Sequence, residues 1–142
     1  FAATPEPPKE VAVSGDHVFV ADGPGGLRMF DVSDPTTPYE VGSFATPYEA
    51  NSVAVAEGYA YVGGGLDSGV LAVDVSTPGA PSEVSYSVFG GKGVAISAGY
   101  VFTVGEDPWW WSGRGLLVLR ACPLFSDGFE SGDTSAWNIT SP

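Results

Sequence analysis

A short stretch of this chain occurs three times at nearly equal spacing, and this repeat constrains the fold more than any other feature. The copies begin at Val11, Val53 and Val94, so they lie 42 and 41 residues apart. Each copy is an apolar run, a turn that contains Gly, and a second run rich in β-branched and aromatic residues. Two such runs around a tight turn predict a β-hairpin in every copy.

The later part of each copy also repeats. Residues 26–33 match residues 69–76, and residues 115–120 are a degraded third version. This run is almost continuously apolar, which predicts a strand covered on both faces, and a fourth strand-like run follows Pro38 and Pro81. Four short strands in a unit of this length are typical of a β-propeller blade. A β-sandwich is the second choice, because a sandwich has no reason to repeat its sequence.

The sequence therefore predicts an all-β fold of about three four-stranded propeller-type blades in an incomplete ring. The content of 20 Gly and 12 Pro suits short strands joined by tight turns. The predicted organisation is an N-terminal strand or linker over 1–10, repeats over 11–52 and 53–93, an incomplete repeat over 94–123, and an acidic Gly/Ser-rich tail over 124–142.

The charge of the chain argues against several partners. Its formal net charge is −12, so a phosphate backbone and an anionic membrane surface would both repel it. No apolar run approaches the ~20 residues of a membrane-spanning helix. Cys122 is the only cysteine, so it forms no disulfide within the chain, and with one His it cannot supply a structural zinc site. We expect no nucleic acid, no membrane insertion and no resident cofactor.

The strings at residues 11–23 and 26–35 resemble the LVIVD-repeat family of bacterial secreted and surface β-propellers. The second copy matches well, and the third departs after Val104, so the resemblance covers residues 9–121. It implies an extracellular propeller and implies no catalytic activity. Residues 124–137 resemble a tail found at the end of many secreted bacterial proteins, which supports a secreted or cell-surface location.

The repeat count predicts association between copies. A closed propeller needs about 4–8 blades, and a shorter arc leaves sheet edges exposed. Phe1-Ala2 followed by Thr4-Pro5 resembles residues 44–47, the end of the fourth run of the first repeat, whereas the third repeat lacks a fourth run. We expect the N-terminal segment of one subunit to complete the third blade of the next, giving a ring or a filament. The alternative is that the chain is the C-terminal fragment of a longer surface propeller.

Aromatic residues mark the expected contacts. Trp109, Trp110 and Trp111 lie between the second and third runs of the third repeat. Adjacent tryptophans in a loop suit a subunit contact, with a plug of the propeller channel and a carbohydrate-stacking platform as alternatives. The full set of predicted interface residues is Phe1, Pro5, Pro7, Trp109, Trp110, Trp111, Phe125, Phe129 and Trp137.

Acidic residues give one weak candidate metal site. Asp127, Glu130 and Asp133 are spaced by three in a Gly/Ser-rich segment and could bind Ca²⁺, although the pattern is not that of an EF-hand. A solvated acidic loop is the alternative. Asp22, after the second run of the first repeat, is expected to cap a turn through hydrogen bonds to the backbone.

Three classes of function remain. The leading prediction is an extracellular structural protein that self-assembles, and the second is a secreted module that binds a glycan or a protein. The third is an enzyme. The sequence has no recognisable nucleophile–base pair, paired carboxylates or metal cluster, so we expect no enzymatic activity.

Overall fold

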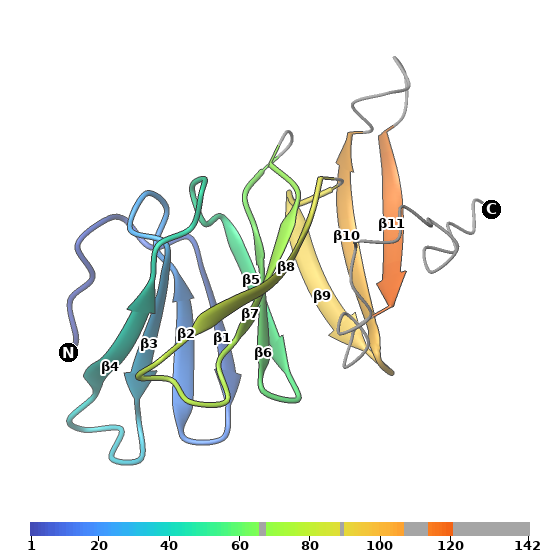
Figure 1. Ribbon diagram of the computed structural model, residues 1–142. Helices are drawn as coiled ribbons and strands as arrows, with labels where there is room; N and C mark the ends of the chain where they lie inside the picture. The colour runs from blue at the N-terminus through green and yellow to red at the C-terminus, as the bar shows by residue number, and fades with distance from the viewer. Residues whose placement is uncertain (66–67, 89, 107–113, 121–142) are drawn as a thin grey trace.

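The computed structural model describes residues 1–65, 68–88, 90–106 and 114–120, and they form three antiparallel β-sheets that stand side by side (Figure 1). Sheet 1 contains β1 (Glu10–Ser14), β2 (His17–Ala21), β3 (Leu27–Asp31) and β4 (Tyr39–Phe44). Sheet 2 contains β5 (Ser52–Ala56), β6 (Tyr59–Gly63), β7 (Val70–Asp74) and β8 (Ser82–Ser87). Sheet 3 contains β9 (Gly93–Ser97), β10 (Tyr100–Glu106) and β11 (Arg114–Arg120).

Within each sheet, strands that are neighbours in the chain pair with each other, so every sheet is a meander that coincides with one sequence repeat. The predicted hairpins are confirmed: β1 pairs with β2, β5 with β6, and β9 with β10. In the second hairpin, Glu57 and Gly58 have φ values of 52° and 83°. Positive φ at both central residues is the requirement of a type I′ turn, which matches the right-handed twist of the flanking strands.

Sheets 1 and 2 share a detail that the sequence did not reveal. The pairing of β3 with β4 shifts register between Met29 and Phe30, and that of β7 with β8 shifts between Ala72 and Val73. These two positions are equivalent in the repeat. A β-bulge at the same place increases the local twist of both sheets, so it is part of the repeated unit.

The sheets contact each other mainly through their first strands. β1 and β2 lie against β5, and β5 and β6 lie against β9. A core cluster that includes Phe19, Met29 and Leu71 fills the space between sheets 1 and 2. A second cluster, which includes Tyr61 and Val101, lies between sheets 2 and 3. Sheet 2 is thus covered on both faces, which explains the continuous burial of β6 and β7.

The connections that lead into sheets 1 and 2 are held differently. Tyr48, in the connection to sheet 2, lies over Gly64: a Cβ on Gly64 would come within 1.9 Å of the Tyr48 ring. Burial raises the pKa of the Tyr48 hydroxyl above its usual value.

The equivalent of Gly64 in the first repeat is Asp22, whose Oδ2 accepts a hydrogen bond from the backbone N–H of Glu6 at 3.4 Å. Asp22 therefore fixes the incoming segment, whereas backbone hydrogen bonds close its own turn.

Acidic residues at the ends of β3 and β7 stabilise the turns that follow. Asp31 accepts hydrogen bonds from the backbone N–H and the hydroxyl of Ser33, at 2.8 and 2.6 Å. Asp74 accepts the same pair from Ser76, at 2.9 and 2.7 Å. These hydrogen bonds favour the charged carboxylates and lower the pKa of both residues.

A pH dependence follows from these turns. Because the folded-state pKa is lowered, the stabilisation is complete above the ordinary Asp pKa of 3.8 and is lost as the pH falls through the lowered pKa. We therefore expect the denaturation midpoint to fall as the pH drops below about 4. The double variant Asp31→Asn/Asp74→Asn should show a shallower fall, because its amides accept hydrogen bonds without titrating. Equal slopes for the two proteins would show that these turns do not set the acid response.

Candidate functional site

In the described part of the chain, no further sheet covers the outer face of sheet 1 or of sheet 3, and exposed apolar side chains on these two faces are the main surface feature. We call N face the side of sheet 1 that points away from sheet 2, with Val11, Val13, Val18 and Val20. Val11 and Val13 are 59% and 65% exposed. Exposed valines on adjacent positions of one sheet face are typical of a surface that packs against another layer.

The second open surface is the side of sheet 3 that points away from sheet 2, which we call the C face. Its centre is the cross-strand row Ala95, Phe102 and Val118, and the next row contains Val104 and Leu116. Val104 is 45% exposed and Leu116 is 62% exposed. The N and C faces lie at opposite ends of the row of sheets (Figure 1).

The repeat makes these two faces complementary. In the first repeat, the positions equivalent to Ala95, Phe102 and Val118 are Ala12, Phe19 and Met29. Phe19 and Met29 are buried against sheet 2, and Ala12 packs against the same cluster.

The same equivalence holds for the N face. In the second repeat, Val53 and Val55 stand at the positions of Val11 and Val13, and they pack towards sheet 1. Each junction inside the chain thus joins the C-type face of one sheet to the N-type face of the next. Among the described residues, the N and C faces are the halves of that junction that have no facing sheet.

The outer half of the N face is charged. Arg28 on β3 donates a hydrogen bond to Glu40 on β4, with 2.9 Å between Nη1 and Oε1. The Arg28 Nε also lies 3.6 Å from Oδ2 of the fully buried Asp22. The equivalent of Arg28 in sheet 2 is Leu71, which is buried. Leu71 belongs to the core cluster between sheets 1 and 2, so Arg28 places a charge at a position of the N face that is apolar in the internal junction.

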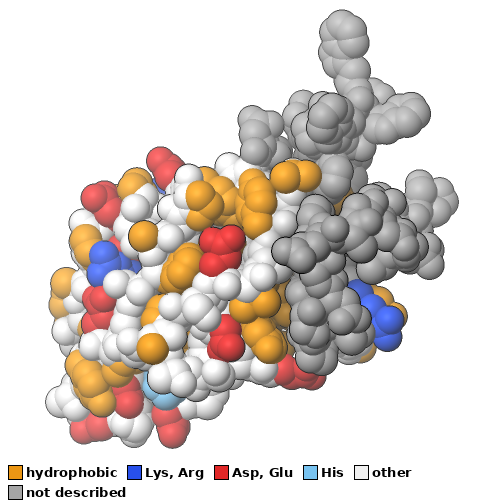
Figure 2. Space-filling model, viewed as in Figure 1, with side chains coloured by type: hydrophobic (Ala, Val, Ile, Leu, Met, Phe, Trp, Pro, Cys, Tyr) orange, Lys and Arg blue, Asp and Glu red, His pale blue; other side chains and the backbone are white. Residues whose placement is uncertain are grey.

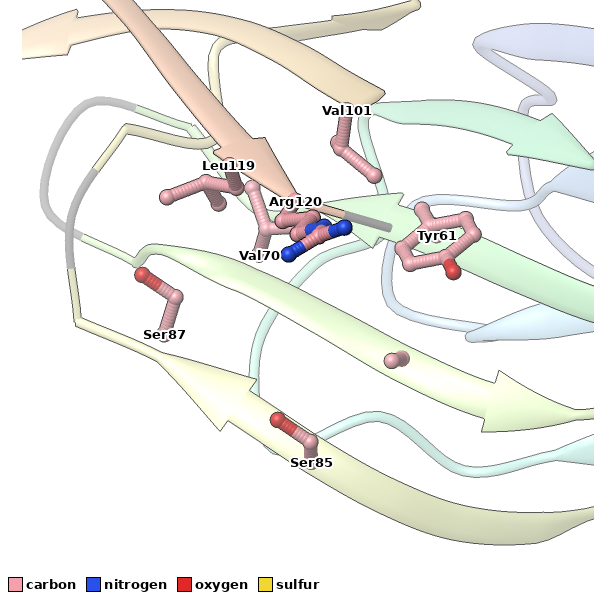
Figure 3. A pocket seen from close by; sticks show the side chains of 8 residues that line it. Tyr61, Val70, Ser85, Ser87, Val101, Leu119 and Arg120 are labelled. Carbon is pink, nitrogen blue, oxygen red and sulfur yellow. The ribbon is translucent and has the colours of Figure 1, made fainter. Parts of the chain in front are cut away.

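A slot separates the outer strands of sheets 2 and 3 (Figure 3). Its cavity volume is about 20 Å³, which is room for about one water molecule and far below the range of small-molecule sites. Its lining consists of Tyr61, Val70, Ala72, Ser85, Ser87, Val101, Leu119 and Arg120. This lining contains aliphatic, hydroxyl and guanidinium groups and no carboxylate or imidazole. The slot lies beside β11, the third strand of sheet 3. In sheets 1 and 2 a fourth strand pairs with the equivalent strand.

Few of the predicted site residues fall within the described ranges. Phe1, Pro5 and Pro7 are exposed and lie in the segment before β1, which contains no strand. The remaining interface residues (Trp109, Trp110, Trp111, Phe125, Phe129 and Trp137) and the candidate Ca²⁺ ligands (Asp127, Glu130 and Asp133) lie outside the described residues.

The described ranges were also searched for a metal site and for a membrane-spanning helix. They contain no group of three or more His, Cys, Asp or Glu side chains placed to bind a metal ion. They also contain no helix long and apolar enough to cross a membrane. On the side shown in Figure 2, acidic side chains are spread among small hydrophobic groups.

Repeated antiparallel meanders that pack through their first strands define a β-repeat protein. The LVIVD repeat signature matches residues 8–46 and 49–87, which include all of sheets 1 and 2 and more than half of the chain. The chain belongs to the LVIVD repeat family. A search among curated proteins finds no match.

Proposed function

We propose that this chain is a secreted structural protein whose sheets are propeller-like blades, and that copies associate head to tail into a ring or a filament. The observation that supports the proposal is the complementarity of the two open faces. The C face of one copy has the residue types that sheets 1 and 2 use in their internal junctions, and β1 and β2 of the N face have the types that receive them, whereas Arg28 on β3 replaces the Leu71 of the internal junction. Such a heterologous contact closes into a ring or continues as a filament.

The exposed side chains set the expected strength of association. Val11, Val13, Tyr100, Val104 and Leu116 are between 44% and 65% exposed, so burying each gains on the order of 1 kcal/mol. Association itself costs about 4–15 kcal/mol of lost freedom. The faces alone therefore support a contact that depends on concentration, and ring closure or additional contacts would strengthen it.

Salt provides a second expected response. With a net charge of −12, copies repel each other at low ionic strength, whereas the proposed contact is mainly apolar. Added salt shortens the Debye length to about 8 Å at 0.15 M and weakens the repulsion. We expect the weight-average mass to increase with NaCl concentration in sedimentation equilibrium. A decrease would indicate that ion pairs hold the copies together.

The direct test places charge on the N face. The double variant Val11→Asp/Val13→Asp should sediment as a monomer at about 100 µM, where the parent chain is expected to form larger species. The matched control is Val88→Asp, because Val88 is 52% exposed and lies in the connection after β8. It should behave like the parent. A parent chain that remains monomeric at this concentration would contradict self-assembly and favour the alternative that further blades of a longer chain cover the faces.

The N-terminal segment supports a narrower form of strand exchange than the sequence predicts. The structure gives residues 1–9 no strand, and Phe1 matches Phe44, the last residue of β4. The segment therefore corresponds to the connection between two blades and supplies at most the end of a fourth strand. This is why the proposal relies on sheet faces rather than on a complete donated strand.

A further inference from the structure

The end of β4 shows how one internal junction is sealed. Phe44, the last residue of β4, pairs with Leu27, the first residue of β3. Leu27 is fully buried, and Phe44 packs against the core cluster between sheets 1 and 2. The chain then crosses to sheet 2 through residues 45–51. Phe44 thus covers the outer end of one sheet just before the chain enters the next.

The same two positions are uncovered at the ends of the molecule. Leu116 follows Gly115 on β11 as Leu27 follows Gly26 on β3, so Leu116 is the equivalent of Leu27. Leu116 is 62% exposed, whereas Leu27 is fully buried. Phe1 matches Phe44 in sequence and is fully exposed. Among the described residues, each half of the sealing pair is thus present once more, with its side chain exposed.

The two halves cannot meet within one copy. The N-terminus lies beside sheet 1 at one end of the row, and β11 lies at the other end (Figure 1). The segment that presents Phe1 is anchored to sheet 1: Lys9 donates its backbone N–H to the carbonyl of Ala21 at 2.8 Å, and Glu6 donates to Asp22. These bonds hold the segment at the end of the strands of sheet 1 where Leu27 lies. In sheet 3, the equivalent end of the strands is the one that carries Leu116.

We infer that Phe1 of one copy seats against Leu116 of the preceding copy and seals the junction between them, as Phe44 covers Leu27 inside the chain. This contact depends on the head-to-tail association proposed above. It specifies which residues meet at the junction and in which direction the copies follow one another. The occupant of the exposed Leu116 position is the N-terminal phenylalanine of a second copy. The anchored connection fixes the direction, so every junction has the same orientation.

Engineered cysteines test this contact. In a Cys122→Ser background, the pair Phe1→Cys/Leu116→Cys should form disulfides between copies under mild oxidation, because the proposed junction brings these positions opposite each other, as Phe44 lies opposite Leu27. Non-reducing gels should show a ladder of covalent multimers that collapses on reduction. Each single-cysteine variant should stay largely monomeric on the gel, because its cysteine meets no other cysteine in the head-to-tail junction. The mismatched pair Phe1→Cys/Val88→Cys should give no ladder, because Val88 lies after β8 rather than on β11.

The outcomes separate the two proposals. If the Cys122→Ser parent associates and the matched pair forms no ladder, the Phe1–Leu116 contact is wrong and the face-to-face association stands. If the parent itself does not associate, both are wrong. In a parent that associates, Phe1→Ala should weaken association by about tenfold or more. Val11→Asp/Val13→Asp, added to the matched pair, should remove the ladder altogether.

Discussion

Replacing Leu71 by Ala should destabilise the chain by about 2–5 kcal/mol, the range found when a large aliphatic side chain is deleted from a packed core. Leu71 lies on β7 of the central sheet, is fully buried, and belongs to the cluster that joins sheets 1 and 2. Its removal leaves a cavity at this junction. Chemical denaturation monitored by circular dichroism should show a lower midpoint, with the slope of the transition unchanged.

The matched control is Leu116→Ala, which deletes the same atoms from a side chain that is 62% exposed. At a concentration where the chain is monomeric, this variant should change the free energy of unfolding by less than about 0.5 kcal/mol. Similar losses of unfolding free energy for Leu71→Ala and Leu116→Ala would contradict this account, because they would mean that the two side chains are equally buried.

The second large effect is expected at Gly69, just before β7. Gly69 has a φ of +67°, and a Cβ there would lie 1.7 Å from the carbonyl oxygen of Ser87. Gly69→Ala therefore adds a backbone clash to the cost of a left-handed conformation, and we expect a loss of about 2–4 kcal/mol. Because the clashing atom belongs to the backbone of β8, sheet 2 cannot relieve it by rotating a side chain.

A second glycine separates these two contributions. Gly99, in the turn between β9 and β10, has a φ of +76°, and a Cβ there would have no atom within 4 Å. Gly99→Ala should therefore cost only the conformational term, about 1–2 kcal/mol. Thermal unfolding of both variants provides the comparison. If Gly99→Ala is as destabilising as Gly69→Ala, the close approach of Gly69 to Ser87 has no energetic effect.

The repeated strands were predictable because strand chemistry is local. Alternating β-branched and aromatic residues around short Gly-containing turns predict the hairpins directly, and the structure confirms them. The β-bulge near Met29 was not predictable, because the glycine beside it, Gly42, is Ser85 in the second repeat, which has the same bulge, and the bulge depends on how β4 pairs with β3. The packing of Tyr48 over Gly64 was also hidden, since the two residues meet only when the connection crosses the end of sheet 2.

For the candidate site too, the sequence predicts the strands but not which of their faces is covered by another sheet. The sequence directed attention to aromatic residues in loops, most of which lie outside the described residues. Val11 and Val13 were recognised as strand residues, but the repeat alone does not show that the N face lacks a neighbouring sheet. The available signal was the equivalence of Val11 to Val53: Val53 is buried against sheet 1, whereas Val11 is exposed because no described sheet lies against it. Repeats at the end of an array usually carry polar residues at such positions, and here only Arg28 on β3 does so, where the second repeat has Leu71.

Electron microscopy of the purified chain by negative staining tests the central claim most directly, because it shows the assembly itself. Head-to-tail packing through the N and C faces predicts uniform rings or filaments built from a three-sheet repeat, and it predicts their loss in Val11→Asp/Val13→Asp. Scattered small particles in the parent chain, at concentrations where the faces should be occupied, would contradict head-to-tail assembly.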